Sequence, residues 1–280
     1  METQKTKFEK FKSLHFQGRA FVIPNPWDAG SARILAAIGF EALATTSAGY
    51  AFSVGKRDSF ASLSQSKILT NAEAIVEATD LPVSADLEDG FGASSDACVD
   101  TVVKACDAGL VGGSIEDATG DPNQPIFDIV QSVERIEAAV EAAKNKPFFL
   151  TARAENFLWG RPDLSDTIRR LQAFSDAGAD VLYAPGLPDI NAIKTVCEEV
   201  GKPVNVVMGL SGPSYSVQEL TDAGVRRISV GGSFARAASG ALRRAAEEVM
   251  KNGTFNYASD AIPDAELAGL MNQSNTPNRR

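Results

Sequence analysis

The chain has 280 residues, 44% of them hydrophobic and 22% charged, a composition typical of a globular protein with a large buried core. Its net charge of −9 and pI near 4.8 argue against nucleic acid or an anionic membrane surface as a partner. The polar N-terminal stretch and the lack of a long apolar run predict neither a signal peptide nor a spanning helix, so we expect a cytoplasmic protein.

The few cysteines and the single histidine limit the kinds of catalytic and metal sites that the chain can form. Cys98, Cys106 and Cys197 show no C-x-x-C spacing and are typical of reduced, buried thiols. The one histidine, His15, lies in an amphipathic stretch, which favours a structural role. A single histidine excludes Ser-His-Asp catalysis and His-rich zinc sites. Any chemistry must therefore use carboxylates, Arg, Tyr, hydroxyls, backbone N–H groups and a metal.

Strand and helix patterns alternate along the chain. The predicted strands are 20–24, 42–46, 82–86, 111–115, 147–153, 181–184, 203–208 and 227–230. Helices are predicted at 7–17, from Asp28 or Ser31 to Ile38, and at 64–79, 94–108, 128–144, 164–177, 189–200, 216–223 and 233–251. Strands spaced about 25–30 residues apart predict a (β/α)₈ TIM barrel. The alternative, a doubly wound open sheet, lacks support because no G-x-G-x-x-G follows the first strand.

We expect residues 1–280 to form a single barrel domain with its core at about 18–252. Residues 253–280 fall outside the eight units. Their apolar side chains, such as Phe255 and Leu270, are not needed by the barrel, so we expect this tail to contact a partner subunit. The polar stretch from Asn272 onward is expected to fray.

Carboxylates follow two of the predicted strands. The third strand ends in Asp86, Glu88 and Asp89, and the fourth ends in Glu116 and Asp117. Carboxylates crowded together repel one another unless a cation lies among them, and Mg²⁺ prefers oxygen ligands. Because barrel enzymes carry their chemistry at the C-terminal ends of the strands, the pattern favours a metal site over a solvated acidic turn.

Other strand ends supply groups that can bind an anion. Asn25 and Tyr183 lie at two of them, and Thr46, Ser47 and Ala48 follow the second strand. Small residues there let backbone N–H groups approach an anion closely, although a tight turn is the alternative.

Arg153 ends the fifth strand, where its planar guanidinium could hold a carboxylate or phosphate through two hydrogen bonds. The alternative is an ion pair with Glu155 or Glu116. A cation beside an acidic metal site suits a small α-oxo acid, because the metal can chelate its carboxylate and keto oxygens and stabilise an enolate.

These motifs together resemble the isocitrate lyase/phosphoenolpyruvate mutase superfamily, from about Pro24 to Phe255. The resemblance is carried by residues 25–33, 46–49, 86–92, 115–117 and 151–153. It implies an α/β barrel whose eighth helix is swapped with a neighbour, in a homodimer or homotetramer. It also implies Mg²⁺, with Mn²⁺ as the alternative ion, bound largely through water to Asp86, Glu88, Glu116 and Asp58.

By the same resemblance, the α-oxo acid lies against Thr46, Ser47 and Ala48 and is held by Arg153. We add Asn25 and Tyr183 to the expected substrate contacts because they lie at strand ends. Catalytic roles are expected for Arg153, Glu116 and Asp86.

The sequence departs from both known branches in the loop 118–125. The lyase branch carries a Lys-Lys/Arg-Cys-Gly-His signature there, and this loop has no Cys, His or Lys. Pro185 follows the sixth strand where the lyases have a Glu, and the Lys and Asn-Ser of the mutase gating loop are not recognisable. Retro-aldol cleavage needs a placed acid and base, whereas decarboxylation needs mainly an electron sink. We therefore expect a lyase that favours decarboxylation of an oxaloacetate-like acid.

Three questions stay open. The bond cleaved beside the keto group of the α-oxo or 2-hydroxy acid could be C–C or C–P. A mutase or hydrolase of phosphonopyruvate or phosphoenolpyruvate is one alternative, since Gly231, Gly232 and Ser233 could bind phosphate at a helix N-terminus. A barrel that binds an oxo acid without turning it over is the other.

Overall fold

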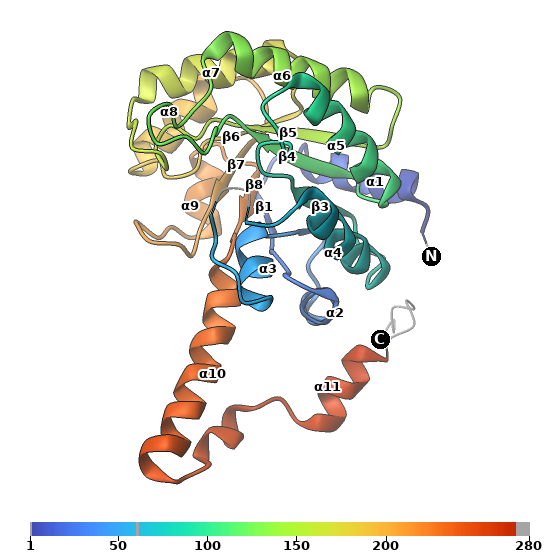
Figure 1. Cartoon of the computed structure of the whole chain (residues 1–280), viewed down its shortest axis with the longest axis vertical. Coiled ribbons are helices and arrows are strands. Elements are labelled where there is room, and N and C mark those ends of the chain that lie inside the picture. Colours follow the sequence, from blue (N-terminus) through green and yellow to red (C-terminus); the bar gives the residue numbers. More distant parts are fainter. Residues whose placement is uncertain (1, 60–61, 273–280) are drawn as a thin grey trace.

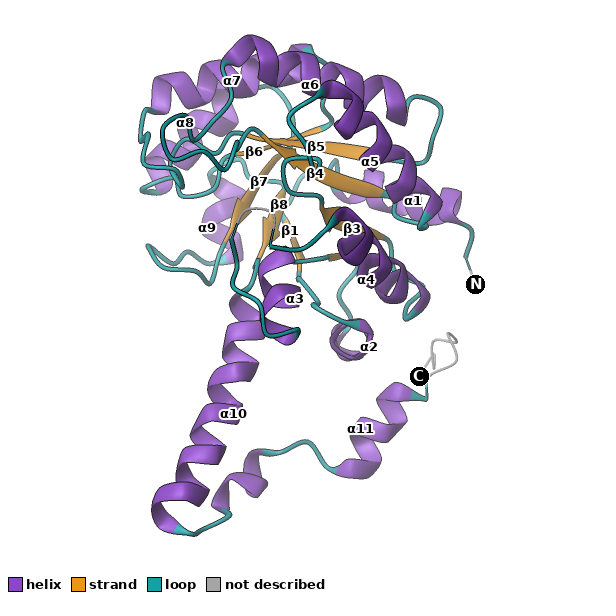
Figure 2. Ribbon diagram, viewed as in Figure 1, coloured by secondary structure: helices purple, strands orange, loops and turns teal. Residues whose placement is uncertain are grey.

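The computed structural model describes residues 2–59 and 62–272. In this part of the chain, eight parallel strands form a nearly closed barrel with helices around it (Figure 1; Figure 2). The strand order is β1-β8-β7-β6-β5-β4-β3-β2. The remaining seam is bridged where the Ala44 N–H donates to the Pro24 carbonyl at 3.0 Å. The predicted TIM barrel is confirmed.

The strands are β1 (Phe21–Ile23), β2 (Leu43–Ala44), β3 (Val83–Asp86), β4 (Gly112–Glu116), β5 (Phe149–Arg153), β6 (Val181–Tyr183), β7 (Val204–Val207) and β8 (Arg227–Ser229). The helices are α1 (Gln4–Leu14), α2 (Ala29–Ile38), α3 (Ser47–Ser53), α4 (Gln65–Glu77), α5 (Ser95–Asp107), α6 (Ile129–Ala143), α7 (Leu164–Asp176), α8 (Ile190–Glu199), α9 (Val217–Asp222), α10 (Ser233–Asn252) and α11 (Asp264–Met271), with a 3₁₀ turn, η1 (Asn256–Asp260). Among the described residues, no helix is both long and apolar enough to cross a membrane.

Local capping explains most of these boundaries. Asp28 caps α2 by accepting from the Ser31 N–H at 2.7 Å, and Gly39 ends the helix with φ of 103°. The structure departs from the predicted elements in several places. Helix α1 begins earlier than expected because Thr3 caps it. Helix α3 was not expected, and it forms because Thr46 caps a turn of small residues directly after β2.

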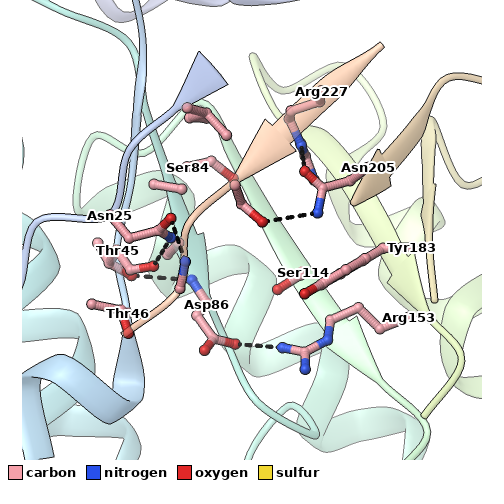
Figure 3. A pocket seen from close by; sticks show the side chains of 15 residues that line it. Asn25, Thr45, Thr46, Ser84, Asp86, Ser114, Arg153, Tyr183, Asn205 and Arg227 are labelled. Carbon is pink, nitrogen blue, oxygen red and sulfur yellow. Dashed lines mark hydrogen bonds and ion pairs between the residues drawn. The ribbon is translucent and has the colours of Figure 1, made fainter. Parts of the chain in front are cut away.

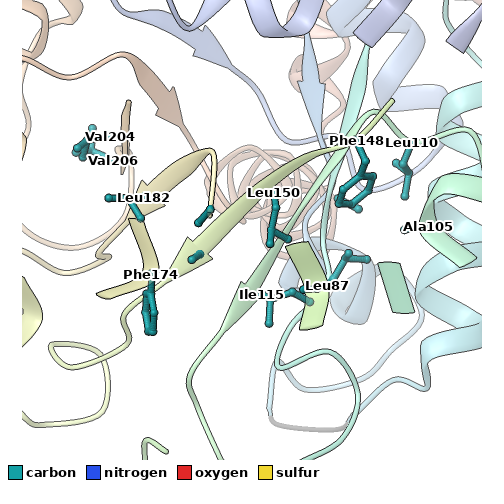
Figure 4. Packing of buried hydrophobic residues seen from close by; sticks show 14 of the residues in the cluster. Leu87, Ala105, Leu110, Ile115, Phe148, Leu150, Phe174, Leu182, Val204 and Val206 are labelled. Atoms are coloured by element: carbon teal, nitrogen blue, oxygen red, sulfur yellow. The ribbon is translucent and has the colours of Figure 1, made fainter. Parts of the chain in front are cut away.

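Alternating residues on the strands divide the core into two parts. The outward set, including Leu150, Leu182 and Val206, packs in the main hydrophobic cluster with residues of the surrounding helices (Figure 4). The inward set at the N-terminal end packs with α1, whose Phe11 contacts Phe149 edge to face at a centroid distance of 6.2 Å. Helix α1 therefore closes this end of the barrel.

Helix α10 does not cover its own barrel. It extends away from the strands and leads through η1 to α11, which returns beside α2 (Figure 1). Ala235 is its one buried residue, whereas Leu242 and Met250 are 73% and 84% exposed. We call residues 233–272 the C-terminal arm.

Candidate active site

A cavity of about 70 Å³ lies inside the barrel at the C-terminal ends of the strands (Figure 3). Each of the eight strands, or the segment directly after it, contributes to the wall. The lining residues are Ile23, Asn25, Ala44, Thr45, Thr46, Ser84, Ala85, Asp86, Ser114, Arg153, Tyr183, Asn205, Arg227, Ser229 and Gly231. Five of the predicted site residues are thus brought to one cavity, namely Asn25, Thr46, Asp86, Arg153 and Tyr183.

Arg153 lies among three carboxylates. Its Nη1 is 3.1 Å from Asp86 Oδ1 and 3.0 Å from Glu116 Oε2, and its Nη2 is 2.8 Å from Glu155 Oε1. The parallel register of β4 and β5 places Glu116 beside Arg153, and the ring of Tyr183 lies 5.1 Å from the guanidinium carbon. The ion pairs considered as an alternative for Arg153 are therefore present. They also hold the guanidinium in place at the cavity wall.

The segment after β2 is tied to Asp86. The Ser47 hydroxyl donates to Asp86 Oδ2 at 2.9 Å, and the Asp86 N–H donates to Thr45 Oγ1 at 3.0 Å. Thr46 accepts from the Gly49 N–H at 3.2 Å and so caps α3. The N–H groups in the first turn of a helix have no intrahelical acceptor, so Ser47 and Ala48 lie where backbone donors are available beside a carboxylate.

Asn25 lines the cavity, and its side-chain amide is bound by backbone groups. Its Oδ1 accepts from the N–H groups of Val230 and Gly231, both at 2.9 Å, and its Nδ2 donates to the Thr45 carbonyl at 2.9 Å. The amide therefore joins the ends of three strands and shapes the cavity wall.

The carboxylates beyond the cavity carry excess negative charge. Burial, together with the charges of Asp86, Asp89 and Asp58, raises the pKa of Glu88 to about 8. Burial also raises the pKa of Glu116, against the effect of Arg153. Asp58 lies on an exposed loop, where partial burial and then the charge of Asp86 raise its pKa. These groups favour protons because burial disfavours the charged carboxylate, and the neighbouring carboxylates add to this.

The donor set fits a hard divalent cation held mostly through water. In the described parts of the chain, no three side chains of His, Cys, Asp or Glu converge closely enough to form a direct metal cage. The available donors are carboxylate oxygens that repel one another, and Mg²⁺ commonly uses one or two such groups and keeps several waters. Asp86, Glu88, Glu116 and Asp58 could supply these contacts.

Two of the strand-end carboxylates serve the scaffold instead. Asp117 is buried, lies 3.0 Å from Arg170 Nη1 and accepts from the Glu155 N–H at 2.8 Å. Asp89 is also buried and accepts from the Phe91 N–H at 2.9 Å. Both fix loops beside the cavity.

The loop 118–125 contributes no side chain to the cavity. Its ends are joined by an antiparallel bridge between Ala118 and Ile126. Asp121 is exposed, and its carboxylate accepts from the Asn123 N–H at 2.8 Å within the same loop.

Sequence reasoning missed several polar residues of the cavity wall, above all Asn205, Arg227 and Ser229. The signal was available, because these residues interrupt the apolar strands β7 and β8 at inward-facing positions. A polar residue in a buried barrel strand indicates an interior site when its neighbours on the strand are apolar.

The fold and the site define a barrel of the isocitrate lyase/phosphoenolpyruvate mutase superfamily, whose members include lyases and mutases of oxo acids. The chain belongs to the phosphoenolpyruvate phosphomutase family, which matches residues 11–250. The predicted resemblance is confirmed.

Three relatives illustrate the range of this superfamily. The solved structure of a candidate lyase/mutase from Burkholderia cenocepacia J2315 is 53% identical, with a TM-score of 0.94, and covers 97% of this chain and 98% of its own. Escherichia coli 2-methylisocitrate lyase is 29% identical over 85% of this chain and 84% of its own length. Oxaloacetate decarboxylase of Pseudomonas entomophila is 26% identical over 94% and 90%, respectively.

Proposed function

We propose that the protein is a Mg²⁺-dependent lyase acting on a small α-oxo or 2-hydroxy acid, and that it favours decarboxylation of an oxaloacetate-like acid through a pyruvate-enolate-like intermediate. The main support is the cavity in which Arg153 and the first turn of α3 face Asp86. This arrangement can hold an oxo acid while negative charge develops on it.

Each group has a role in this proposal. The N–H groups at Ser47 and Ala48 and the guanidinium of Arg153 bind the acid and stabilise the developing oxyanion. Arg153 would exchange part of its contact with Asp86 and Glu116 for the ligand. When bound, Mg²⁺ supplies a Lewis acid that polarises the keto oxygen.

Decarboxylation is favoured because loop 118–125 offers no acid–base pair. Cleavage of a 2-hydroxy acid removes a hydroxyl proton and protonates the departing carbon, so it needs two placed groups. The one titratable side chain of loop 118–125 is Asp121, and its carboxylate is engaged within the loop. Loss of CO₂ requires mainly the charge stabilisation already described.

A phosphonopyruvate mutase or hydrolase is the second candidate. Gly231 lines the cavity, and Gly232 begins the 20-residue helix α10 without a side-chain cap. Free N–H groups at that position could bind a phosphonate.

We also propose a homodimer or homotetramer in which the C-terminal arm lies against a neighbouring subunit. The exposed Leu242, Met250 and Phe255 of the arm support this, because such apolar area is rarely left in water. A monomeric mass in solution would contradict it.

The proposed activity is tested by incubating the protein and Mg²⁺ with oxaloacetate, 2-methylisocitrate, isocitrate and phosphonopyruvate, and detecting pyruvate, glyoxylate and phosphate. We expect pyruvate from oxaloacetate above the metal-only background, and none after EDTA treatment. Phosphate release would favour the second candidate. Tight Mg²⁺-dependent binding of an oxo acid without turnover of any acid would indicate a binding protein.

A further inference from the structure

Arg227 is a buried cation at the inner end of the cavity. It lies on β8, is 5% exposed and lines the cavity next to Asn205 (Figure 3). Its Nε donates to Asn205 Oδ1 at 2.8 Å, and its Nη2 donates to Thr151 Oγ1 at 2.9 Å. Its Nη1 lies 3.5 Å from His15 Nε2.

All three partners are neutral. His15 Nδ1 must donate to the Phe11 carbonyl, 2.9 Å away, because a carbonyl can only accept, and Nε2 is then left as an acceptor toward Arg227. Burial and the charge of Arg227 lower the pKa of His15 to about 3, so it stays neutral. Within the described chain, no carboxylate lies within 4.0 Å of an Arg227 nitrogen.

An uncompensated buried charge is costly, and buried charges are normally paired. Burial lowers the pKa of Arg227 to about 10, which still leaves it charged at neutral pH. Arg153, by contrast, is surrounded by three carboxylates. The two arginines of one cavity therefore differ in that only Arg227 has no anionic partner.

Hydrogen bonds connect Arg227 to the wall that a ligand would contact. Because Arg227 donates to Asn205 Oδ1, the Asn205 amide is oriented with Nδ2 toward Ser229, to which it donates at 3.1 Å. Ser229 lines the cavity, as does Tyr183, and its hydroxyl donates to the Val206 carbonyl at 3.3 Å. The charge of Arg227 can thus polarise the hydroxyl groups on this wall.

We propose that Arg227 is a further positioning residue of this site, and that its uncompensated charge, acting through Asn205 and Ser229, makes the cavity select a doubly charged acid over a singly charged acid of the same shape. The inference rests on the proposed function, because it assumes that the oxo acid binds in this cavity.

Oxalate and oxamate test this directly, since they have nearly the same shape and differ by one charge. Their Kd values are measured by calorimetry at saturating Mg²⁺ for the wild type, Arg227→Met and Arg227→Lys. The wild type should prefer oxalate. Arg227→Met should reduce the oxalate-over-oxamate preference about tenfold, as expected for a unit charge acting at short range in protein. Arg227→Lys should restore most of the preference.

Arg170→Met is the matched control, because Arg170 is also buried but pairs with Asp117 and Asp166 outside the cavity. It should leave the preference unchanged even if it lowers stability. Asn205→Leu keeps the charge of Arg227 and removes the hydrogen bonds that link Arg227 to Ser229. It should lower the oxalate-over-oxamate preference about threefold. If Arg227→Met does not fold, Asn205→Leu tests whether Arg227 sets the oxalate-over-oxamate preference.

The outcomes separate the two proposals. Equal weakening of oxalate and oxamate in Arg227→Met, or an unchanged preference in Asn205→Leu, would mean that Arg227 is merely structural and would overturn the inference. A wild type that binds neither compound in the presence of Mg²⁺ would instead contradict the proposed function.

Discussion

The two ends of the barrel interior differ in what fills them: aromatic side chains at the N-terminal end and charged side chains at the C-terminal end. At the N-terminal end, His15 lies between Phe11 and Phe21 with ring centroids 4.8 and 5.0 Å away, and its ring nitrogens contact the Phe11 carbonyl and the Arg227 guanidinium. At the C-terminal end, Arg153 pairs with Glu116 and Glu155, and the pKa values of both carboxyls are raised by burial. The first end is packed for stability, and the second holds charges that only a cation and an anionic ligand would balance.

The largest effect should come from removing the acidic donors. Asp86→Ala and Glu88→Ala are expected to abolish activity while leaving the fold intact, because both carboxylates lie at the barrel mouth where Mg²⁺ would bind. Circular dichroism checks the fold, and pyruvate release checks activity. Full activity in EDTA-treated wild-type protein would show that the metal assignment is wrong.

The next effect concerns Arg153. Arg153→Ala should lower activity by about 10²–10³, the usual cost of removing one donor that stabilises a developing oxyanion. Asp121→Ala is the matched control, because its carboxylate faces its own loop, and it should change kcat/KM far less. The assignment fails if the two substitutions have similar effects.

A smaller effect should appear in the pH dependence of metal binding. The carboxyl of Glu88 has a pKa of about 8 in the folded protein and an ordinary value of 4.5. Between these values the native state holds a proton that the unfolded chain has lost, so stability without metal should fall as the pH rises. Mg²⁺ binds the deprotonated form, so its affinity should rise up to about pH 8.

Thermal melts across this pH range, with EDTA and with Mg²⁺, measure both trends. Glu88→Gln cannot titrate and should flatten them. A metal-free melting temperature that increases from pH 5 to pH 8 in the wild type but not in Glu88→Gln would contradict the sign of the effect.

The smallest effect on activity should come from the N-terminal end. Phe11→Ala should cost about 3–5 kcal/mol of stability, because Phe11 is fully buried against Phe149. Below the melting transition, kcat/KM should change little. Denaturant unfolding and steady-state kinetics separate these quantities, and a large loss of activity in protein that remains folded would show that the two ends are coupled.

The barrel and the acidic cluster could be predicted from sequence patterns alone. Strand periodicity identifies the strands, and parallel strands in a barrel bring their C-terminal ends to one face. Asp86, Glu116 and Arg153 could therefore be placed together without coordinates. The sequence left open whether Arg153 pairs with Glu155 or Glu116 or holds a ligand, because the rotamer of Arg153 depends on three neighbouring strands.

The contact between Asn205 and Arg227 and the position of α10 depend on residues far apart in the sequence, so local sequence patterns do not predict them. Asn205 and Arg227 meet only because adjacent strands pair in register, so each looked like an isolated polar residue. Helix α10 has an ordinary amphipathic pattern, and the pattern does not say whether its apolar face belongs to this barrel or to a neighbour. The swap of this helix with a neighbour was implied by the family resemblance alone, and it stays a prediction.

The most direct test of the central claim is kcat/KM for oxaloacetate and for 2-methylisocitrate, measured with Mg²⁺ and again after its removal by EDTA. We predict Mg²⁺-dependent turnover of oxaloacetate that exceeds that of 2-methylisocitrate, because the site offers charge stabilisation and loop 118–125 offers no acid–base pair. Faster cleavage of 2-methylisocitrate would contradict the account and would show that such a pair exists in the cavity or in the loop above it.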